Sequence, residues 1–312
     1  MRLFWQSPHF DFMGKRKLAL AFSLTLILIS IGSLAFQGLE LGIDFTGGTL
    51  IELHYDEPAD LDEVRKVLES AGYERFVVQH FGTVHEVLIQ LQPVEGRSSA
   101  ELSDEVVRLL RSHTEDRIEV RRVEFVGPQV GEELREDGGL AVVYALIGIL
   151  IYVALRFEYR FAFGAIIALV HDVLITVGFF SVTRIPFDLS VLAAVLAVIG
   201  YSLNDTIVVY DRIRENFRRM RKGTTVEIVN ASINQTLSRT IITSFTTLLV
   251  LAALAMFGGE VIHSFALALI VGVVVGTYSS IYVASTAAVM LGVSRKDLLP
   301  PKKEGAEADG RP

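Results

Sequence analysis

The chain has 312 residues and a net charge of −7, and 51% of its residues are hydrophobic. Its mean hydropathy of +0.45 lies above that of ordinary soluble domains, so the composition disfavours a soluble protein and excludes disorder over most of the length. No cysteine is present, which excludes disulfides, thiolate metal sites and cysteine nucleophiles. Residues 37–137 hold 10 basic and 23 acidic side chains, a balance that repels phosphate and disfavours a nucleic-acid partner.

Six stretches of the chain carry few or no charges and are long enough to cross a bilayer as helices, because about 20 apolar residues span its ~30 Å core. The first stretch follows a basic cluster, as a signal peptide does, but it is longer than a signal-peptide core and five more stretches follow it. We therefore interpret it as an uncleaved membrane helix. The predicted spans are residues 18–36, 138–155, 161–183, 189–210, 240–259 and 261–291.

The basic residues in the short loops predict the orientation, because such residues gather on the cytoplasmic side. The loops on the side of the two termini carry 16 basic residues, whereas the short loops on the opposite side carry only Arg184. We therefore expect residues 1–17, the basic connection 211–239 and the tail 292–312 to be cytoplasmic. The acidic segment 37–137 is then extracytoplasmic.

The extracytoplasmic segment alternates strand and helix patterns in the order β-α-β-β-α-β. Alternating apolar residues predict four strands, and capping residues followed by an apolar face at helical spacing predict two helices. This order is the ferredoxin-like arrangement, which hosts many functions and by itself names none. The predicted strands are 49–55, 76–81, 86–91 and 118–126, and the predicted helices are 61–71 and a second one capped by Ser98 or Ser99.

A glycine-rich segment, GIDFTGGT at 42–49, lies between the first span and the first strand. It is not a phosphate-binding loop, since such a loop follows a strand, opens a helix and carries Gly-Lys-Ser/Thr. We interpret it as a tight irregular turn that ties the soluble domain to the membrane surface. The sequence contains no metal-ligand cluster, nucleotide motif or Gly-x-Ser-x-Gly, and it predicts neither an enzyme nor a cofactor nor a metal site.

Ionisable residues within the spans are the most informative ones, because a charge in the bilayer centre costs several kcal/mol and usually has a partner. Asp205 lies five residues before the predicted end of the fourth span, and Arg239 lies at the entrance of the fifth. Both should lie at a similar depth, so an ion pair between them is plausible. The polar stripe that Arg239 shares with Thr243 suggests a hydrated proton path, and Tyr201, Ser202 and Asp205 form a second stripe. The alternatives are a static ion pair that fixes helix register, or an arginine that reaches lipid phosphates.

Asp172, near the middle of the third span, is the rival carboxylate, with Thr176 one turn later. It could carry protons or be a protonated side chain bonded to a neighbouring helix. We expect the adjacent His171 to point to a different face. Asp172, Asn204 and Thr243 make up a candidate secondary polar site within the membrane. Gly272-x-x-x-Gly276 in the sixth span predicts close helix packing.

Several of these runs are familiar. The run GYSLNDTIVVYDRIREN at 200–216 resembles the fourth-span signature of the SecF proteins, and SRTIITSFTT at 238–247 resembles their fifth-span motif. The segment 42–49 and the His171-Asp172 pair also fit. The SecF proteins belong to the SecD/SecF family of Sec-translocon accessory subunits, which is related to the resistance-nodulation-division transporters. The resemblance covers nearly the whole chain, up to Asp297.

The resemblance implies a subunit that acts with SecD in the bacterial inner membrane. Such a complex uses the proton-motive force to help unfolded preproteins leave the SecYEG channel on the periplasmic side, with YajC as a further candidate partner. The position of Asp205 is then the proton-responsive carboxylate and that of Arg239 its basic partner. The alternatives are half of a proton-coupled small-molecule exporter on the same scaffold, or a non-catalytic scaffold subunit. The sequence leaves the choice between H⁺ and Na⁺ open.

Overall fold

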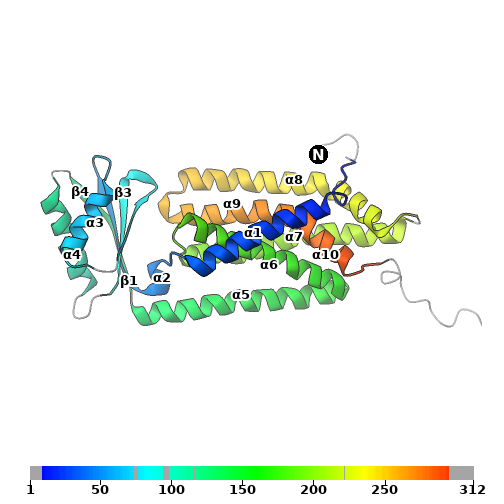
Figure 1. Cartoon of the computed structure of the whole chain (residues 1–312), viewed down its shortest axis with the longest axis horizontal. Coiled ribbons are helices and arrows are strands. Elements are labelled where there is room, and N and C mark those ends of the chain that lie inside the picture. Colours follow the sequence, from blue (N-terminus) through cyan, green and yellow to red (C-terminus); the bar gives the residue numbers. More distant parts are fainter. Residues whose placement is uncertain (1–8, 74–75, 94–97, 115–116, 221, 295–312) are drawn as a thin grey trace, which may run out of the picture.

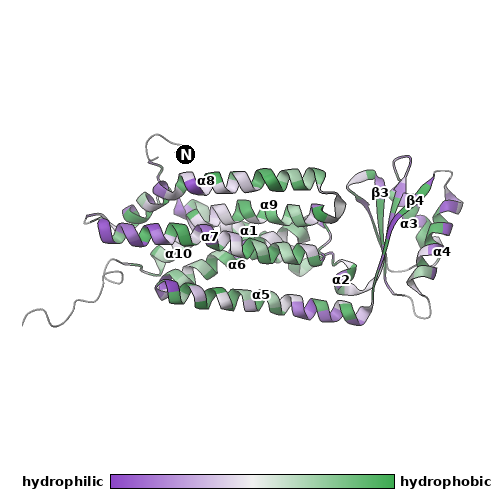
Figure 2. Cartoon of the chain, turned by 180° about the vertical axis from the view of Figure 1, so that it is seen from behind, coloured by the Kyte–Doolittle hydropathy of each residue, from purple (hydrophilic) through white to green (hydrophobic). Residues whose placement is uncertain are grey.

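Long helices form a bundle, and a small α+β domain lies across one end of it (Figure 1). The computed structural model describes residues 9–73, 76–93, 98–114, 117–220 and 222–294. We call the end of the bundle next to this domain the domain end, and the opposite end the far end. Figure 2 shows hydrophobic residues along the helices of the bundle, whereas hydrophilic residues gather at its two ends and over the domain.

Six helices of the described chain are long and apolar enough to cross a membrane, which confirms the predicted number of spans. The last span is a composite, because a π-helical turn, η1, interrupts it between two α-helical parts. The helices are α1 (Arg16–Phe36), α5 (Pro128–Arg156), α6 (Tyr159–Thr183), α7 (Leu189–Arg219), α8 (Thr225–Phe257), α9 (Glu260–Ser279), η1 (Ser280–Ala284) and α10 (Ser285–Met290).

Three helices run well past the spans predicted for them. Helix α5 begins at Pro128, ten residues before the predicted span, since proline suits the first helical position. Helices α7 and α8 take up most of the predicted connection 211–239. Glu215 accepts from Arg212 and Arg219 at 2.7 and 2.8 Å along α7, and such pairs support a helix beyond the apolar segment. The predicted tail 292–312 lies, from residue 295 on, outside the described residues.

The soluble domain has the predicted element order. Its sheet is antiparallel throughout, with the strands in the order β2-β3-β1-β4. Asp60 caps the first helix, and Ser98 caps the second through a capping box with Glu101. Alternate strand residues such as Ile51 and Leu53 are buried in a core shared with both helices. The elements are β1 (Gly48–Tyr55), α3 (Leu61–Ser70), β2 (Phe76–Phe81), β3 (Thr83–Leu91), α4 (Ser99–His113) and β4 (Ile118–Val126).

The two faces of the sheet have different neighbours. Helices α3 and α4 lie on the face away from the bundle, and the other face is turned toward the domain end (Figure 1). On that inner face a short helix, α2 (Ile43–Thr46), places Ile43 against Leu50 and Leu88. A cavity of about 480 Å³ separates the inner face from the start of α7. The sheet therefore lies over the bundle and touches it through α2.

Two glycines make the junction between α2, the sheet and α5 possible. Gly47 and Gly48 have φ angles of +68° and +129°, which L-residues rarely adopt. A Cβ on Gly47 would lie 2.6 Å from Pro128 Cα, and one on Gly48 would lie 2.3 Å from Leu91 O. The segment predicted as a tight turn is thus a single helical turn followed by two glycines. It brings the start of β1 against the start of α5.

The Gly48→Ala variant tests this junction. We expect it to destabilise the β1–β3 pairing by about 3 kcal/mol or more, since the new Cβ adds a backbone clash to the strain of a positive φ. The matched control is Gly72→Ala, where φ is +85° but no heavy atom lies within 4 Å, so only about 1 kcal/mol is lost. Amide hydrogen exchange in β1 and β3 measures both. Equal exchange rates in the two variants would contradict the expected clash.

The glycines of the last span pack closely against another helix, as the sequence predicts, and the structure shows that this helix is α7. A Cβ on Gly272 would lie 2.1 Å from Val198 Cγ2, and one on Gly276 would lie 3.0 Å from Ser202 Cβ. Small residues of this kind let two helix backbones approach closely. The approach brings the hydroxyls of both helices toward the buried carboxylates described next.

Candidate functional site: two buried carboxylates in the bundle

Asp205 lies on α7 inside the bundle and is 8% exposed. Thr240 of α8 donates from Oγ1 to Oδ1 at 2.8 Å, and Ser280 of the last span donates from Oγ to Oδ2 at 2.8 Å. Both carboxylate oxygens therefore accept a hydroxyl hydrogen, each from a different helix. Hydrogen bonds of this kind favour the ionised carboxylate, whereas its burial opposes ionisation. Asp205 thus connects three helices through one ionisable group.

Arg239 does not contact Asp205 directly. Its side chain is exposed on α8, and among the described residues it pairs with no carboxylate within 4.0 Å. Consecutive residues of a helix point about 100° apart, so when Thr240 faces α7, Arg239 faces outward. The positive charge of Arg239 still acts on Asp205, at longer range than an ion pair. The spacing made Arg239 a plausible partner of Asp205, but the residue that contacts Asp205 directly is Thr240.

The two predicted polar stripes have different surroundings. On α7, Ser202 and Asp205 are buried, whereas the neighbouring Asn204 is exposed. On α8, Thr243 is exposed, and its hydroxyl donates to carbonyls of its own helix, those of Arg239 and Thr240, at 3.0 Å. Asn204 and Thr243 therefore face away from the interior of this chain. The structure does not bring them together with Asp172.

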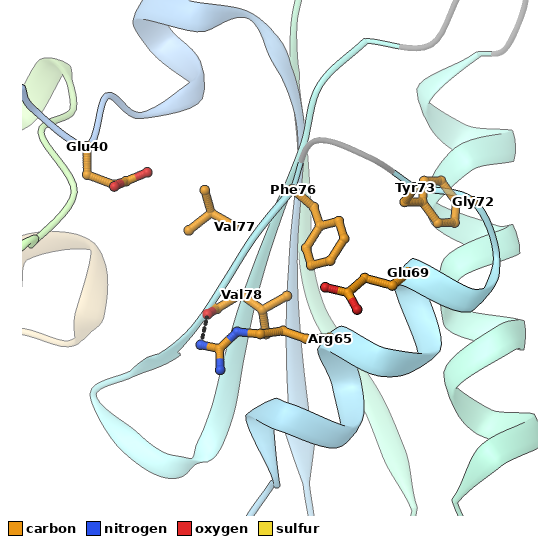
Figure 3. A pocket seen from close by; sticks show the side chains of 8 residues that line it. All are labelled: Glu40, Arg65, Glu69, Gly72, Tyr73, Phe76, Val77 and Val78. Atoms are coloured by element: carbon orange, nitrogen blue, oxygen red, sulfur yellow. Dashed lines mark hydrogen bonds between the residues drawn. The ribbon is translucent and has the colours of Figure 1, made fainter. Parts of the chain in front are cut away.

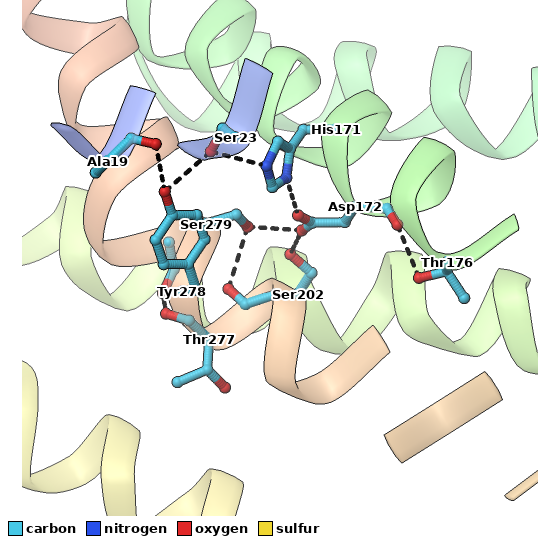
Figure 4. Close-up of polar contacts among 11 residues, drawn as sticks. Ala19, Ser23, His171, Asp172, Thr176, Ser202, Thr277, Tyr278 and Ser279 are labelled. Carbon is cyan, nitrogen blue, oxygen red and sulfur yellow. Dashed lines mark hydrogen bonds and ion pairs between the residues drawn. The ribbon is translucent and has the colours of Figure 1, made fainter. Parts of the chain in front are cut away.

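Asp172 of α6 is fully buried and has partners on three sides (Figure 4). Its Oδ2 accepts from Ser202 of α7 and, at 2.7 Å, from Ser279 of α9. Its Oδ1 lies 2.8 Å from Nδ1 of His171, which is 3% exposed. The expectation that His171 points to a different face is wrong, since the imidazole turns back onto the adjacent carboxylate. Thr176 donates to the Asp172 backbone oxygen at 2.7 Å and not to its side chain.

His171 extends the cluster toward α1. Its Nε2 lies 3.1 Å from Ser23 Oγ, and Ser23 Oγ lies 3.0 Å from Tyr278 Oη. Tyr278 in turn donates to the Ala19 carbonyl at 2.6 Å, and its ring stacks on the imidazole with centroids 6.1 Å apart (Figure 4). Asp172 therefore lies at the end of a chain of hydrogen-bonding groups that leads to α1.

Two consecutive serines lie where α9 meets the π-helical turn η1 and contact the two carboxylates: Ser279 contacts Asp172, and Ser280 contacts Asp205. In a π turn the backbone hydrogen bonds span five residues, where those of an α-helix span four. Side-chain hydroxyls donate to two carbonyl oxygens of this turn. Ser285 donates to Ser280 O at 3.1 Å, and Tyr210 donates to Ala284 O at 2.9 Å. Turns of this type often occur at functional sites. Sequence reasoning missed these serines, although the Ser279-Ser280 doublet in an uncharged span was a usable signal.

A second feature, a cavity of about 780 Å³, lies in the soluble domain between α3, β2 and Glu40 (Figure 3). Glu40 and Glu69 lie on opposite sides of it, and the Arg65 guanidinium donates to Val78 O at 2.9 Å. Arg65, the cation among the described residues that line the cavity, is thus already bonded to the backbone. Among the described residues, no group of three or more His, Cys, Asp or Glu is placed to hold a metal ion. The buried carboxylates are the stronger candidate site.

Known families match most of the chain. The family described as protein export membrane protein SecD/SecF, C-terminal, matches residues 106–294, which include both carboxylates. The SecD/SecF GG motif matches residues 32–59, which include Gly47 and Gly48 of the domain junction. The two matched segments thus contain the buried carboxylates and the glycine junction described above.

Curated relatives and solved structures agree with this assignment. The chain is 52% identical over 303 residues to "Protein translocase subunit SecF" of Vibrio alginolyticus, which covers 96% of both chains. It is 52% identical over 303 residues to the protein of the same name from Pseudomonas aeruginosa, covering 97% of both.

Among solved structures, the chain resembles SecDF of Thermus thermophilus, described as a translocon-associated membrane protein, with a TM-score of 0.84 and 42% identity. The match covers 92% of this chain and 39% of that chain, so this chain spans about two fifths of SecDF. The super-membrane-facing form of SecDF matches with a TM-score of 0.68 over the same shares. By sequence and by fold, the chain belongs to the SecF branch of the SecD/SecF family of protein export membrane proteins.

Proposed function

We propose that this chain is the SecF-type half of a SecDF unit that uses the proton-motive force to promote protein export. The observation that carries the proposal is Asp205, an ionisable group buried among apolar spans and held by Thr240 and Ser280. Burying such a group costs several kcal/mol, and intramembrane carboxylates commonly mark proton pathways. In the resembling family the corresponding carboxylate responds to protons and the position of Arg239 is basic.

The hydrogen bonds of Asp205 provide a physical route from protonation to helix movement. An ionised carboxylate only accepts, and both hydroxyls then point at it. When a proton binds Oδ2, that oxygen becomes a donor and Ser280 must accept from it. Ser280 has an alternative acceptor, because its Oγ lies 3.0 Å from Thr277 O. Protonation thus changes how the last span is held against α7.

The relatives support one of the partners. The SecDF structures support SecD as the partner, since this chain covers only 39% of the SecDF chain. We further propose that the pair acts beside the SecYEG translocon in the bacterial inner membrane, on unfolded preproteins, with YajC as an additional partner. The rival functions are an exporter of small molecules and a scaffold without proton coupling. Preprotein export from inverted vesicles decides among them. An uncoupler should slow export when this chain is present, and Asp205→Asn, which a scaffold would tolerate, should remove that sensitivity.

Proton-driven action also requires the predicted orientation, with the soluble domain outside and the far end in the cytoplasm. The chain has no cysteine, so single cysteines can report their side without background. Ser112 of α4 and Lys222 of the α7–α8 connection are both exposed. We expect Ser112→Cys to react with an impermeant thiol reagent in intact spheroplasts, and Lys222→Cys to react only after lysis. The reverse pattern would contradict the orientation.

A further inference from the structure

The ionisable pair His171–Asp172 differs from the other polar contacts between the helices. Ser33 and Ser181 join α1 to α6 at 2.7 Å, and Ser244 and Thr277 join α8 to α9 at 2.7 Å. These contacts are neutral and hold helices together without the cost of burying an ionisable group. A neutral pair could link α6 to its neighbours in the same way. Packing alone therefore does not account for a buried imidazole and carboxylate at this position.

We propose that Asp172 and His171 form a second proton-binding site, linked to Asp205 by the adjacent hydroxyls of Ser279 and Ser280. This inference rests on the proposed proton coupling at Asp205 and extends it to a second group in series. Ser202, which contacts Asp172, precedes Asp205 by three residues on α7, a rise of about 4.5 Å. Asp172 thus lies nearer the domain end, and a proton that enters there reaches it before Asp205.

The geometry lets the pair take up one proton and keep the hydrogen bonds of His171 with Asp172 and with Ser23. Before uptake, His171 donates from Nδ1 to Asp172 Oδ1 and accepts at Nε2 from Ser23. A proton that arrives at Nε2 turns the Ser23 hydroxyl toward Tyr278 Oη, 3.0 Å away. The Nδ1 proton then passes to Oδ1, and the imidazole is neutral again with its hydrogen on Nε2. Tyr278 can accept from Ser23, because its own hydrogen is donated to Ala19 O.

The two serines couple this site to Asp205. Ser279 Oγ lies 2.7 Å from Asp172 Oδ2 and 3.2 Å from Gly276 O, so it has a second acceptor when Asp172 changes state. Ser280 has the same choice between Asp205 and Thr277 O. The two residues are consecutive, so a shift of one moves the other. In addition, two like charges in a region of low dielectric constant oppose each other's ionisation.

Few other titratable groups surround the pair. Helix α1 offers only hydroxyls beside it, and α5 has no charged residue between Asp137 and Arg156. Among the described residues, the elements packed around the pair also carry Asp205 and Tyr201 of α7, Tyr278 of α9, Tyr282 of η1 and, through Asp205, Arg239 of α8. Tyr144 and Tyr152 of α5, Tyr210 of α7 and His263 of α9 lie on the same elements.

Infrared difference spectroscopy tests the proposal on this chain copurified with its SecD partner. A pH change should produce absorption from two buried carboxyl groups, of which Asp172→Asn removes one and Asp205→Asn the other. Ser279→Ala should shift the frequency of the Asp172 carboxyl band, because that group loses one hydrogen bond. Ser244→Ala is the matched control, because it breaks a buried hydroxyl contact of the last span that involves no carboxylate.

Export from vesicles provides the second readout. Asp172→Asn should lower uncoupler-sensitive export about tenfold, and His171→Asn, which keeps a donor toward Asp172 but cannot take up a proton, should lower it as well. The inference would be overturned if Asp172→Asn gave the same spectra and the same export as the unmodified complex. If Asp172→Asn misfolds, His171→Asn decides, because normal export from the His171→Asn vesicles would also overturn the inference. Normal export in Asp205→Asn would instead refute the proposed function, while the carboxyl signal of Asp172 still tests this site.

Discussion

Vesicles that carry Asp205→Asn should lose the uncoupler-sensitive part of preprotein export and keep the part driven by ATP. Asparagine has nearly the same volume and still accepts from Thr240 or Ser280, so the bundle should fold. It cannot gain or lose a proton, so protons can no longer pass through this position. One charge that crosses 100 mV supplies about 2.3 kcal/mol, which is about a fiftyfold bias. The ratio of export with and without uncoupler measures the loss.

Two further variants show whether this loss is specific. Thr240→Val removes a direct donor to Asp205, and Arg239→Met removes a charge that acts on it at longer range, so both should weaken export less than Asp205→Asn. Ser244→Ala should leave export unchanged, because its partner Thr277 contacts no carboxylate through this bond. Uncoupler-sensitive export at the normal rate from Asp205→Asn vesicles would show that Asp205 is not the proton site.

The chain produced without a SecD subunit should be degraded at least about tenfold faster than in the complex. Its spans present polar side chains outward, with Arg239 and Thr243 exposed on α8 and Asn204 exposed on α7. A charged side chain that faces lipid costs several kcal/mol, so this surface requires a protein partner. Pulse–chase half-lives with and without coexpressed SecD measure the effect.

An apolar substitution on this surface separates a missing partner from general instability. Asn204→Leu should lengthen the half-life of the lone chain, because leucine suits a surface that faces lipid. Asn216→Leu is the matched control, since Asn216 is buried and donates to Ser232 and Gln235 at 2.8 and 3.0 Å. It should shorten the half-life in either setting. A long-lived, protease-resistant lone chain would contradict the need for a partner.

Sequence reasoning succeeded where a pattern repeats over many residues. Uncharged runs predicted the six spans, and alternation predicted the strands, with β2 and β4 at the residues observed. It failed where a contact depends on which of two consecutive helix residues faces the neighbouring helix. Whether Arg239 or Thr240 faces Asp205 depends on a rotation of about 100°, and spacing leaves that rotation undetermined.

Sequence reasoning also missed two further features. The ends of α5, α7 and α8 were missed because charges mark the limit of the apolar segment and not the end of the helix. The contacts of Ser279 and Ser280 with two different carboxylates depend on how the last span packs against α6 and α7, which the serine doublet alone does not specify.

The soluble domain is attached to the bundle at a single junction, about which it tilts as one body. The strand that enters it and the strand that leaves it are neighbours, and their ends at the junction pair with each other, Gly48 with Val126. Both connections therefore turn together when α5 moves. A strand of eight residues is about 26 Å long, so a tilt of about 10° at Gly48 carries the far end of β1 by about 4–5 Å. Small displacements within the bundle are thus amplified at the outer edge of the sheet.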